Sequence, residues 1–389
     1  MTLFTNGRIV TPDEVFVGSV VVENGLIRAA EPGRPAARGP MSEPMSEPMS
    51  STVDLDGDYL VPGVVELHTD VLERHAIPRP GVHWPELPAV LAYDSQLVGA
   101  GITTVLDSLA IGYLVDTGQR PRDPRPLVEA IRTARAAGLL RADHHLHMRC
   151  EVSTALVVQD FVPFADDPLV RLVSLMDHAP GQRQFVDVAK YREYNQGRYG
   201  LSDAQLDALV ERRLEERARY AEEHRAAITA LCRKHGLPVA SHDDATVAHV
   251  DEAMQAGAAI AEFPTTLEAA RAAHDYGLAV LAGAPNLVRG QSHSGNVPAA
   301  LLAERGWLDV LSSDYVPASV LHGAFLLHAR HGMTLPRAIA TVSATPARRV
   351  GLEDRGAIAA GRRADLVRVR VAGEVVAVRG VWCRGERAA

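Results

Sequence analysis

The sequence predicts an α/β protein in which a (β/α)8 barrel of the TIM type is inserted into a small β-sandwich domain. Eight short apolar runs alternate with Ala-rich amphipathic segments, and β-rich stretches precede and follow them. We place the β-sandwich at residues 1–61 and 356–389 and the barrel at 62–355. A doubly wound sheet is the alternative, but it usually has fewer strands and a Gly-rich first turn, which this sequence lacks.

The N-terminal stretch contains a hairpin signal, because Asn24 and Gly25 separate two runs rich in β-branched residues. Residues 41–51 repeat Met-Ser-Glu-Pro twice and begin a third copy. Pro and Ser at this spacing do not pack a core, so we expect a flexible surface loop there.

Each barrel strand is expected where a short apolar run lies between turn and helix signals. The eight runs occupy residues 64–68, 102–107, 145–151, 170–178, 238–242, 259–264, 278–285 and 308–314. The carboxyl ends of the strands in such a barrel meet at one face, where reactive groups gather.

The clearest helix is predicted over residues 201–235, in a long insertion between the fourth and fifth strands. Ser202 and Gln205 form a capping box at its start, and Gly236 ends it. Loops at this face of a barrel often form lids. An insertion without any catalytic role is an equally good interpretation.

Bulk composition favours a globular protein and disfavours several other classes. The chain has 389 residues, of which 47% are hydrophobic and 23% charged, and its net charge of −8 offers no basic surface for nucleic acid. Its three cysteines are widely spaced and form no CxxC pair, so neither a disulfide framework nor a zinc knuckle is predicted. The sequence shows neither a signal peptide nor a membrane-spanning run, and we expect a cytoplasmic protein.

Nearly every predicted strand ends in a side chain that can bind a metal or move a proton. On a strand, residues i and i+2 point to the same side, so His68 and Asp70 can converge on one point. The other strands end in Asp107, Glu151, Asp177-His178, His242-Asp243-Asp244, Glu262, Asn286 and Asp314. One such residue alone would be interpreted as a helix cap or a core hydrogen-bond partner, whereas the set predicts a metal-dependent hydrolase.

The predicted metal ligands are His68, Asp70, Glu151, His178, His242 and Asp314. Histidines with carboxylates suit Zn²⁺, with Mn²⁺ or Fe²⁺ as alternatives, and one or two ions are equally compatible. Many barrel hydrolases bridge two metal ions with a carbamylated lysine, but Lys190 and Lys234, the two lysines of this sequence, end no strand. In a two-metal site a carboxylate would therefore have to bridge, and Glu151 is the natural candidate. Asp314 is the predicted catalytic residue, which accepts a proton from a metal-activated water.

Several motifs resemble the amidohydrolase superfamily. They are Pro-Gly-x-x-Glu-x-His-x-Asp at residues 62–70, Asp314 at the end of the eighth strand, and Gly-Arg-x-Ala-Asp-Leu-Val at 361–367. Further segments across nearly the whole chain resemble one branch, the diphosphatases of the carbon–phosphorus lyase pathway of phosphonate metabolism. They include Ser-Leu-Met-Asp-His-Ala-Pro-Gly-Gln-Arg-Gln-Phe at 174–185 and Arg-Gly-Gln-Ser-His-Ser-Gly-Asn at 289–296.

The resemblance implies hydrolysis of a ribose 5-triphosphate between its α and β phosphates, with release of pyrophosphate. Asp70 stands where a second His is usual in the superfamily, and this departure matches the diphosphatase branch. Asp70 either binds the metal or orients His68. A phosphorylated sugar needs cationic partners, and the candidates in nearby loops are Arg79, Arg183, Arg289 and His293.

Two other functions fit the same scaffold less well. The alternative is a cyclic-amide hydrolase or deaminase on the same scaffold, but a neutral amide does not need several loop arginines. A barrel that binds without catalysing is disfavoured by the ligands at nearly every strand end. The expected partner is a small phosphorylated sugar, with no nucleic acid or membrane, and we expect a homodimer.

Overall fold

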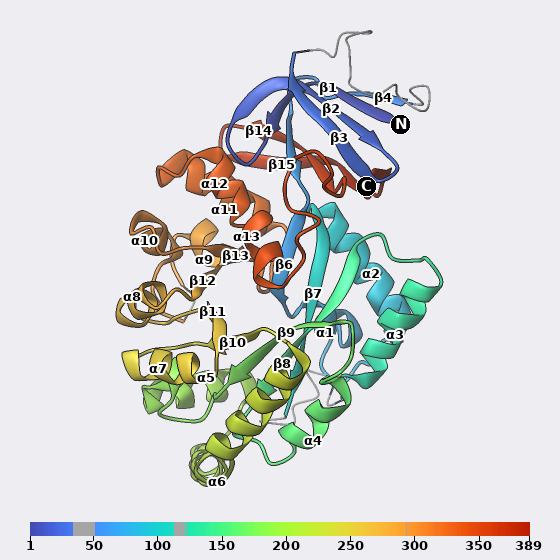
Figure 1. Cartoon of the computed structure of the whole chain (residues 1–389). Helices are drawn as coiled ribbons and strands as arrows, with labels where there is room; N and C mark the ends of the chain where they lie inside the picture. The colour runs from blue at the N-terminus through green and yellow to red at the C-terminus, as the bar shows by residue number, and fades with distance from the viewer. Residues whose placement is uncertain (34–50, 113–120, 122, 293) are drawn as a thin grey trace.

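The computed structural model describes residues 1–33, 51–112, 121, 123–292 and 294–389 (Figure 1). Most of the Met-Ser-Glu-Pro repeat and the candidate phosphate ligand His293 lie outside the described residues.

Eight parallel strands form the barrel, and each lies at one of the eight predicted runs. They pair in chain order, from the first strand to the eighth. They are β6 (Val64–Thr69), β7 (Ile102–Ile111), β8 (Asp143–Glu151), β9 (Val170–Met176), β10 (Val239–His242), β11 (Ala258–Glu262), β12 (Ala279–Gly283) and β13 (Val310–Ser312). The predicted fold class is therefore confirmed, while the exact division of the chain between two domains stays a prediction.

A buried carboxylate joins the last strand of the barrel to the first. Oε1 of Glu66 accepts hydrogen bonds from the backbone N–H of His68 at 2.8 Å and the hydroxyl of Ser312 at 2.7 Å. Its Oε2 accepts the backbone N–H of Ser313 at 2.7 Å. Burial raises the pKa of Glu66 to about 7. The Glu of the opening motif thus fixes the strand that carries His68 against the strand that precedes Asp314.

Helices cover the outside of the barrel and connect its strands (Figure 1). Threonines begin two of them, because the side chains of Thr246 and Thr266 accept the backbone N–H groups of His249 and Ala269. The helices are α1 (Val71–Ala76), α2 (Glu86–Gly99), α3 (Arg125–Ala136), α4 (Val157–Phe161), α5 (Val188–Tyr199), α6 (Asp203–His235), α7 (Val247–Gln255), α8 (Leu267–Asp275), α9 (Ala284–Arg289), α10 (Ala299–Glu304), α11 (Ser319–Arg330), α12 (Leu335–Ala340) and α13 (Ala344–Arg349). Short 3₁₀ turns lie at Val162–Phe164 and Arg183–Phe185.

The two ends of the chain share a second sheet, as predicted. Its strands are β1 (Thr2–Val10), β2 (Val15–Glu23), β3 (Leu26–Pro32), β4 (Ser51–Asp54), β5 (Tyr59–Pro62), β14 (Leu366–Ala372), β15 (Val375–Cys383) and β16 (Glu386–Arg387). Antiparallel pairing of β5 with β14 joins the N-terminal strands to the C-terminal ones, and Phe4 packs edge-on against Trp382 in the shared core. Asn24 and Gly25 both have positive φ, which confirms the hairpin turn.

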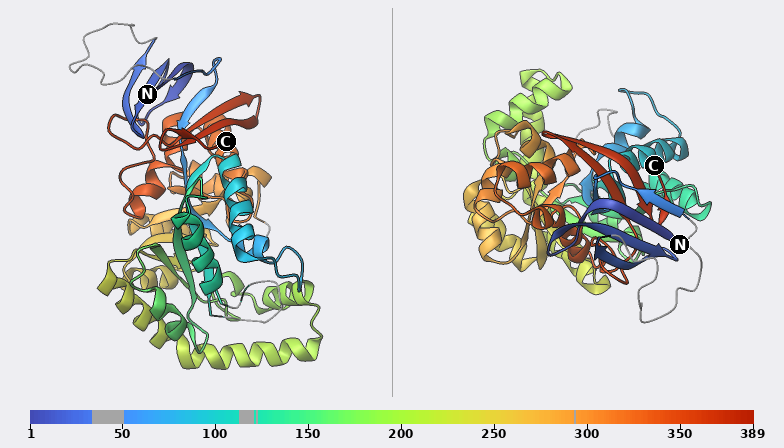
Figure 2. Two further views of the ribbon diagram at one scale, coloured as in Figure 1. Left: turned by 90° about the vertical axis from the view of Figure 1, so that its right-hand side faces the viewer. Right: turned by 90° about the horizontal axis from the view of Figure 1, so that it is seen from above.

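The long helix α6 begins two residues later than predicted, directly after the predicted capping residue Ser202, and ends at the predicted residue. Ser202 and Gln205 form the capping box, and Gly236 ends the helix in the left-handed conformation. The helix lies at the opposite end of the molecule from the terminal sheet (Figure 2). Its Arg213 donates a hydrogen bond to Ser153 at 2.7 Å, and its Arg217 donates to Asp177 at 2.9 Å. These bonds tie α6 to loops that follow two barrel strands, and a lid motion stays a prediction. Within the described residues, every helix is too short or too polar to cross a membrane.

Candidate metal centre and active site

The carboxyl ends of the barrel strands surround a cavity of about 440 Å³. All six predicted metal ligands line this cavity: His68, Asp70, Glu151, His178, His242 and Asp314. They come from five different strand ends, so the fold assembles one site from residues far apart in the sequence.

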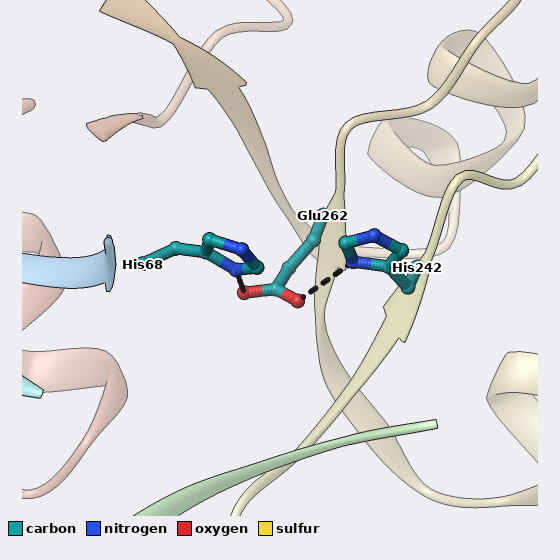
Figure 3. Close-up of side chains that lie close together, drawn as sticks. All are labelled: His68, His242 and Glu262. Carbon is teal, nitrogen blue, oxygen red and sulfur yellow. Dashed lines mark hydrogen bonds and ion pairs between the residues drawn. The ribbon is translucent and has the colours of Figure 1, made fainter. Parts of the chain in front are cut away.

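The first group that could hold a metal consists of His68, His242 and Glu262, all of them buried. Their ligand atoms lie within 4.8 Å of one another. Nδ1 of His68 is 3.0 Å from one carboxylate oxygen of Glu262, and Nδ1 of His242 is 3.2 Å from the other (Figure 3). Burial alone would raise the pKa of Glu262, but the neighbouring imidazoles of His68 and His147 hold it well below its usual range. Glu262 is therefore a carboxylate that two imidazoles share.

A second group uses the same His242 and adds His178 and Asp243. Oδ2 of Asp243 lies 3.4 Å from Nε2 of His242 and 3.6 Å from Nε2 of His178. Burial alone would lower the pKa of His178, but Glu151 and Asp243 raise it to about 9. Because His242 belongs to both groups, the two candidate positions are neighbours.

Asp314 lies in the same cavity, close to Asp70. Its φ of 51° places it in the left-handed region, two residues after the end of β13. Burial, and then the negative charge of Asp70, raise the pKa of Asp314 to about 7. A carboxyl group with such a pKa can both accept and release a proton near neutral pH.

Two carboxylates in the candidate metal-binding groups were not among the predicted ligands. Glu262 is the last residue of β11, and Asp243 follows β10 directly. Both residues were among the ionisable side chains expected at strand ends, but the choice of ligands among neighbouring carboxylates depends on local backbone geometry. Asp243 has a φ of 57°, and its left-handed turn sets the direction of the side chain. The predicted ligands Asp70, Glu151 and Asp314 line the cavity outside the two groups.

The donor set fits a divalent metal ion. Imidazole nitrogens and carboxylate oxygens are the ligands that Zn²⁺, Mn²⁺ and Fe²⁺ bind. Several buried carboxylates lie together here, and the effect of Asp70 on the pKa of Asp314 shows their mutual repulsion. A bound cation would relieve that repulsion, since it adds positive charge where the protein places negative charge.

The structure places the three predicted phosphate-binding arginines in different surroundings. Arg289 lines the cavity at its rim, where its side chain is exposed. Arg79 is exposed and does not line the cavity. Arg183 is 4% exposed and pairs with Asp244 and Glu252, so its charge is already matched inside the protein. Of the three, only Arg289 lies where a ligand in the cavity could meet it.

Sequence reasoning missed Arg149, which lies on β8 and lines the cavity. Every second residue of this strand is ionisable, and all but the first, which is partly buried, are buried: Asp143, His145, His147, Arg149 and Glu151. Alternate residues of a strand share one face, so the period of two was the signal that could have found Arg149. A second missed arginine, Arg74, lines the rim of the cavity and lies over the ring of Tyr315.

The amidohydrolase family model matches residues 74–388, which is most of the chain. This chain belongs to the amidohydrolase family. It is 45% identical over 387 residues to the alpha-D-ribose 1-methylphosphonate 5-triphosphate diphosphatase of Escherichia coli (strain K12), with 99% of both chains covered.

Solved structures with the same fold are more distant in sequence. The N-acetyl-D-glucosamine-6-phosphate deacetylase of Mycobacterium smegmatis superposes with a TM-score of 0.60 at 18% identity and full coverage of both chains. The A. niger ochratoxinase gives a TM-score of 0.63 at 13% identity, with 99% of this chain and 95% of that one covered. Amidohydrolases are metal-dependent, and the two groups around His242 are the candidate metal-binding residues of this member.

Proposed function

We propose that this amidohydrolase hydrolyses alpha-D-ribose 1-methylphosphonate 5-triphosphate to the corresponding 5-phosphate and pyrophosphate, a step in phosphonate catabolism. The observation that carries the proposal is the 45% identity to the diphosphatase from Escherichia coli over 99% of both chains. The alignment spans both the barrel and the terminal sheet, so it covers every strand end that lines the cavity.

The metal would be held by His68, His178 and His242 together with nearby carboxylates. When bound, a divalent ion, of which Zn²⁺ fits these ligands well, polarises a phosphoryl oxygen and lowers the pKa of water. The shared position of His242 suits either one or two ions.

Asp314 accepts the proton of the attacking water in this proposal. It lies in the cavity with the metal-binding groups, and its raised pKa makes proton uptake favourable near pH 7. At the rim, Arg289 is placed to neutralise charge on the leaving pyrophosphate. Asn286 is held beside it, because its side chain bonds the backbone of Val297 and Ala299.

The direct test incubates the purified, metal-loaded protein with the ribose 5-triphosphate and follows the products by ³¹P NMR. The expected result is one pyrophosphate for each 5-phosphate formed. Release of single orthophosphates, or no reaction, would refute the proposal. Dihydroorotate and hydantoin should be assayed in parallel, because a 101-residue segment is 32% identical to the dihydroorotase of Methanopyrus kandleri (strain AV19). That match covers 22% of this chain, and we expect no ring opening.

A further inference from the structure

Arg149 is a buried cation in the floor of the cavity. It lies near the carboxyl end of β8, two residues before Glu151, so both side chains point to the same face of the strand. Arg149 is 7% exposed and lines the cavity. The two other arginines that line the cavity, Arg74 and Arg289, are exposed. Arg149 is therefore the innermost of the three.

The guanidinium of Arg149 keeps unsatisfied donors among the described residues. Its Nε and one terminal nitrogen are buried without a hydrogen bond. Each of the other buried arginines in the described residues forms an ion pair with a carboxylate: Arg183, Arg213, Arg355 and Arg363. Leaving a buried charge unpaired is costly, and proteins rarely do so without a function.

Within the described part of the chain, the carboxylates of Asp314 and Asp243 feel the charge of Arg149, and neither forms an ion pair with it. Burial and Asp70 raise the pKa of Asp314, while the charge of Arg149 acts in the opposite direction. Its charge also helps to hold the pKa of Asp243 low, against the effect of burial. Both carboxylates belong to the proton-transfer and metal-binding groups. The free donors of Arg149 thus remain for a ligand that enters the cavity.

A phosphoryl group fits these donors. The N–H groups of a guanidinium form a planar fork that matches two oxygens of a phosphate, and their strength rises in a desolvated site. An exposed arginine can attract a phosphate, but a buried one can also fix its position. Because Arg149 lies beside the metal-binding groups and Asp314, an oxygen that it holds would belong to the phosphorus nearest the reacting groups.

We propose that Arg149 binds the phosphoryl group under attack, while the exposed arginines at the rim meet the pyrophosphate. This inference rests on the proposed function. In the step concerned, the oxygen of water forms a bond to the α phosphorus, and the bond from that phosphorus to the bridging oxygen breaks. The bridging oxygen keeps the electron pair and leaves with pyrophosphate, and Asp314 takes the proton from the water. Arg149 stabilises the charge that builds on the non-bridging oxygens.

The test compares Arg149→Met and Arg149→Lys with Arg305→Met, all in the metal-loaded protein. Arg305 is exposed and does not line the cavity, so its substitution is a control for loss of an arginine. For Arg149→Met we expect a fall in kcat of about 10²-fold or more, as for loss of one transition-state donor. Metal content should stay at the wild-type level. Arg149→Lys, which keeps the charge without the fork, should recover part of the loss.

A binding measurement separates this inference from the proposed function. Calorimetric titration of the metal-loaded protein with inorganic phosphate needs no turnover, so it reports on Arg149 even if the ribose triphosphate is not the substrate. We expect at least tenfold weaker binding in Arg149→Met and unchanged binding in Arg305→Met. The inference is overturned if Arg149→Met binds phosphate as the wild type does. It is also overturned if Arg149→Lys matches the wild type in both kcat and phosphate affinity, because a simple counter-charge would then explain Arg149.

Discussion

Glu151 and His178 are joined by two hydrogen bonds. Nδ1 of His178 lies 2.7 Å from Oε2 of Glu151, and the backbone N–H of His178 donates to Oε1 at 3.0 Å. The same Oε1 accepts the hydroxyl of Ser153, which in turn accepts a bond from Arg213 of α6. Both oxygens of Glu151 are thus engaged by the protein, and Nε2 of His178 is left to face Asp243. Carboxylates that orient metal-binding imidazoles are held in the same way, and His178 belongs to a candidate metal-binding group.

We predict that Glu151→Gln weakens metal binding without unfolding the protein. The amide oxygen can still accept the backbone N–H of His178. Its NH₂ group, however, would face an N–H at Nδ1 of the ring, and the repulsion between the two donors would rotate the imidazole. Loss of such an orienting partner typically costs about 10–100-fold in metal affinity or activity. Metal titration with a competing chelator measures the effect, and Glu129→Gln on the exposed face of α3 is the matched control. Wild-type metal affinity in Glu151→Gln would contradict this role.

We predict that Asp314→Asn abolishes turnover and leaves metal content nearly intact. Asparagine has a similar shape and tolerates the left-handed backbone of this position, so the fold should not change. It cannot accept a proton, and loss of a general base costs about 10²–10⁴-fold in rate. Pyrophosphate release and elemental analysis are the two measurements. Activity within a few-fold of the wild type would remove Asp314 from proton transfer.

The barrel was predictable because its signals are local and repeated. Each run of apolar residues, such as that before His68, is long enough for one buried strand and is followed by a helical pattern. The terminal sheet was predictable for the same reason, since Asn24 and Gly25 mark a hairpin whatever surrounds them. These signals need no knowledge of distant contacts.

The details of the site depend on contacts that the sequence does not display. Arg183 looked like a loop charge, but its partners Asp244 and Glu252 come from a segment far along the chain. Arg149 lay inside the predicted strand at 145–151 and was not singled out. Whether an arginine faces a ligand or a carboxylate is decided by packing, so loop position alone was a weak guide.

Gly63 offers a test of the junction between the barrel and the terminal sheet. A Cβ at this position would lie 2.1 Å from Oγ1 of Thr103 and 2.9 Å from Cβ of Asp365. We predict that Gly63→Ala destabilises the protein by about 1–3 kcal/mol, the usual cost of overpacking. Thermal unfolding measures it. Gly99→Ala, in α2, is the control, because a Cβ there would meet nothing within 4 Å apart from its chain neighbours and its own helix backbone, and we expect neutral or slightly higher stability. Equal effects of the two substitutions would contradict the crowding at Gly63.

The buried pair of His144 and Asp107 should make stability depend on pH. Nδ1 of His144 lies 2.9 Å from Asp107, and its Nε2 lies 3.3 Å from Asp94. Burial alone would lower the pKa of His144, but these two carboxylates raise it from 6.5 to about 9. A raised pKa in the folded state means that the protonated histidine stabilises the fold. This contribution is complete below pH 6.5 and is lost as the pH rises through about 9.

Urea unfolding at pH 6, 7.5, 9 and 10 compares the wild type with His144→Gln and isolates this contribution. Other groups titrate in both proteins, so the difference between their free energies of unfolding reports on His144. We expect the wild type to be the more stable at pH 6 and its advantage to shrink as the pH rises from about 6.5 through about 9. A difference that stays constant, or that grows with pH, would mean that folding does not raise the pKa of His144. Its contacts with Asp107 and Asp94 would then be ordinary hydrogen bonds rather than ion pairs.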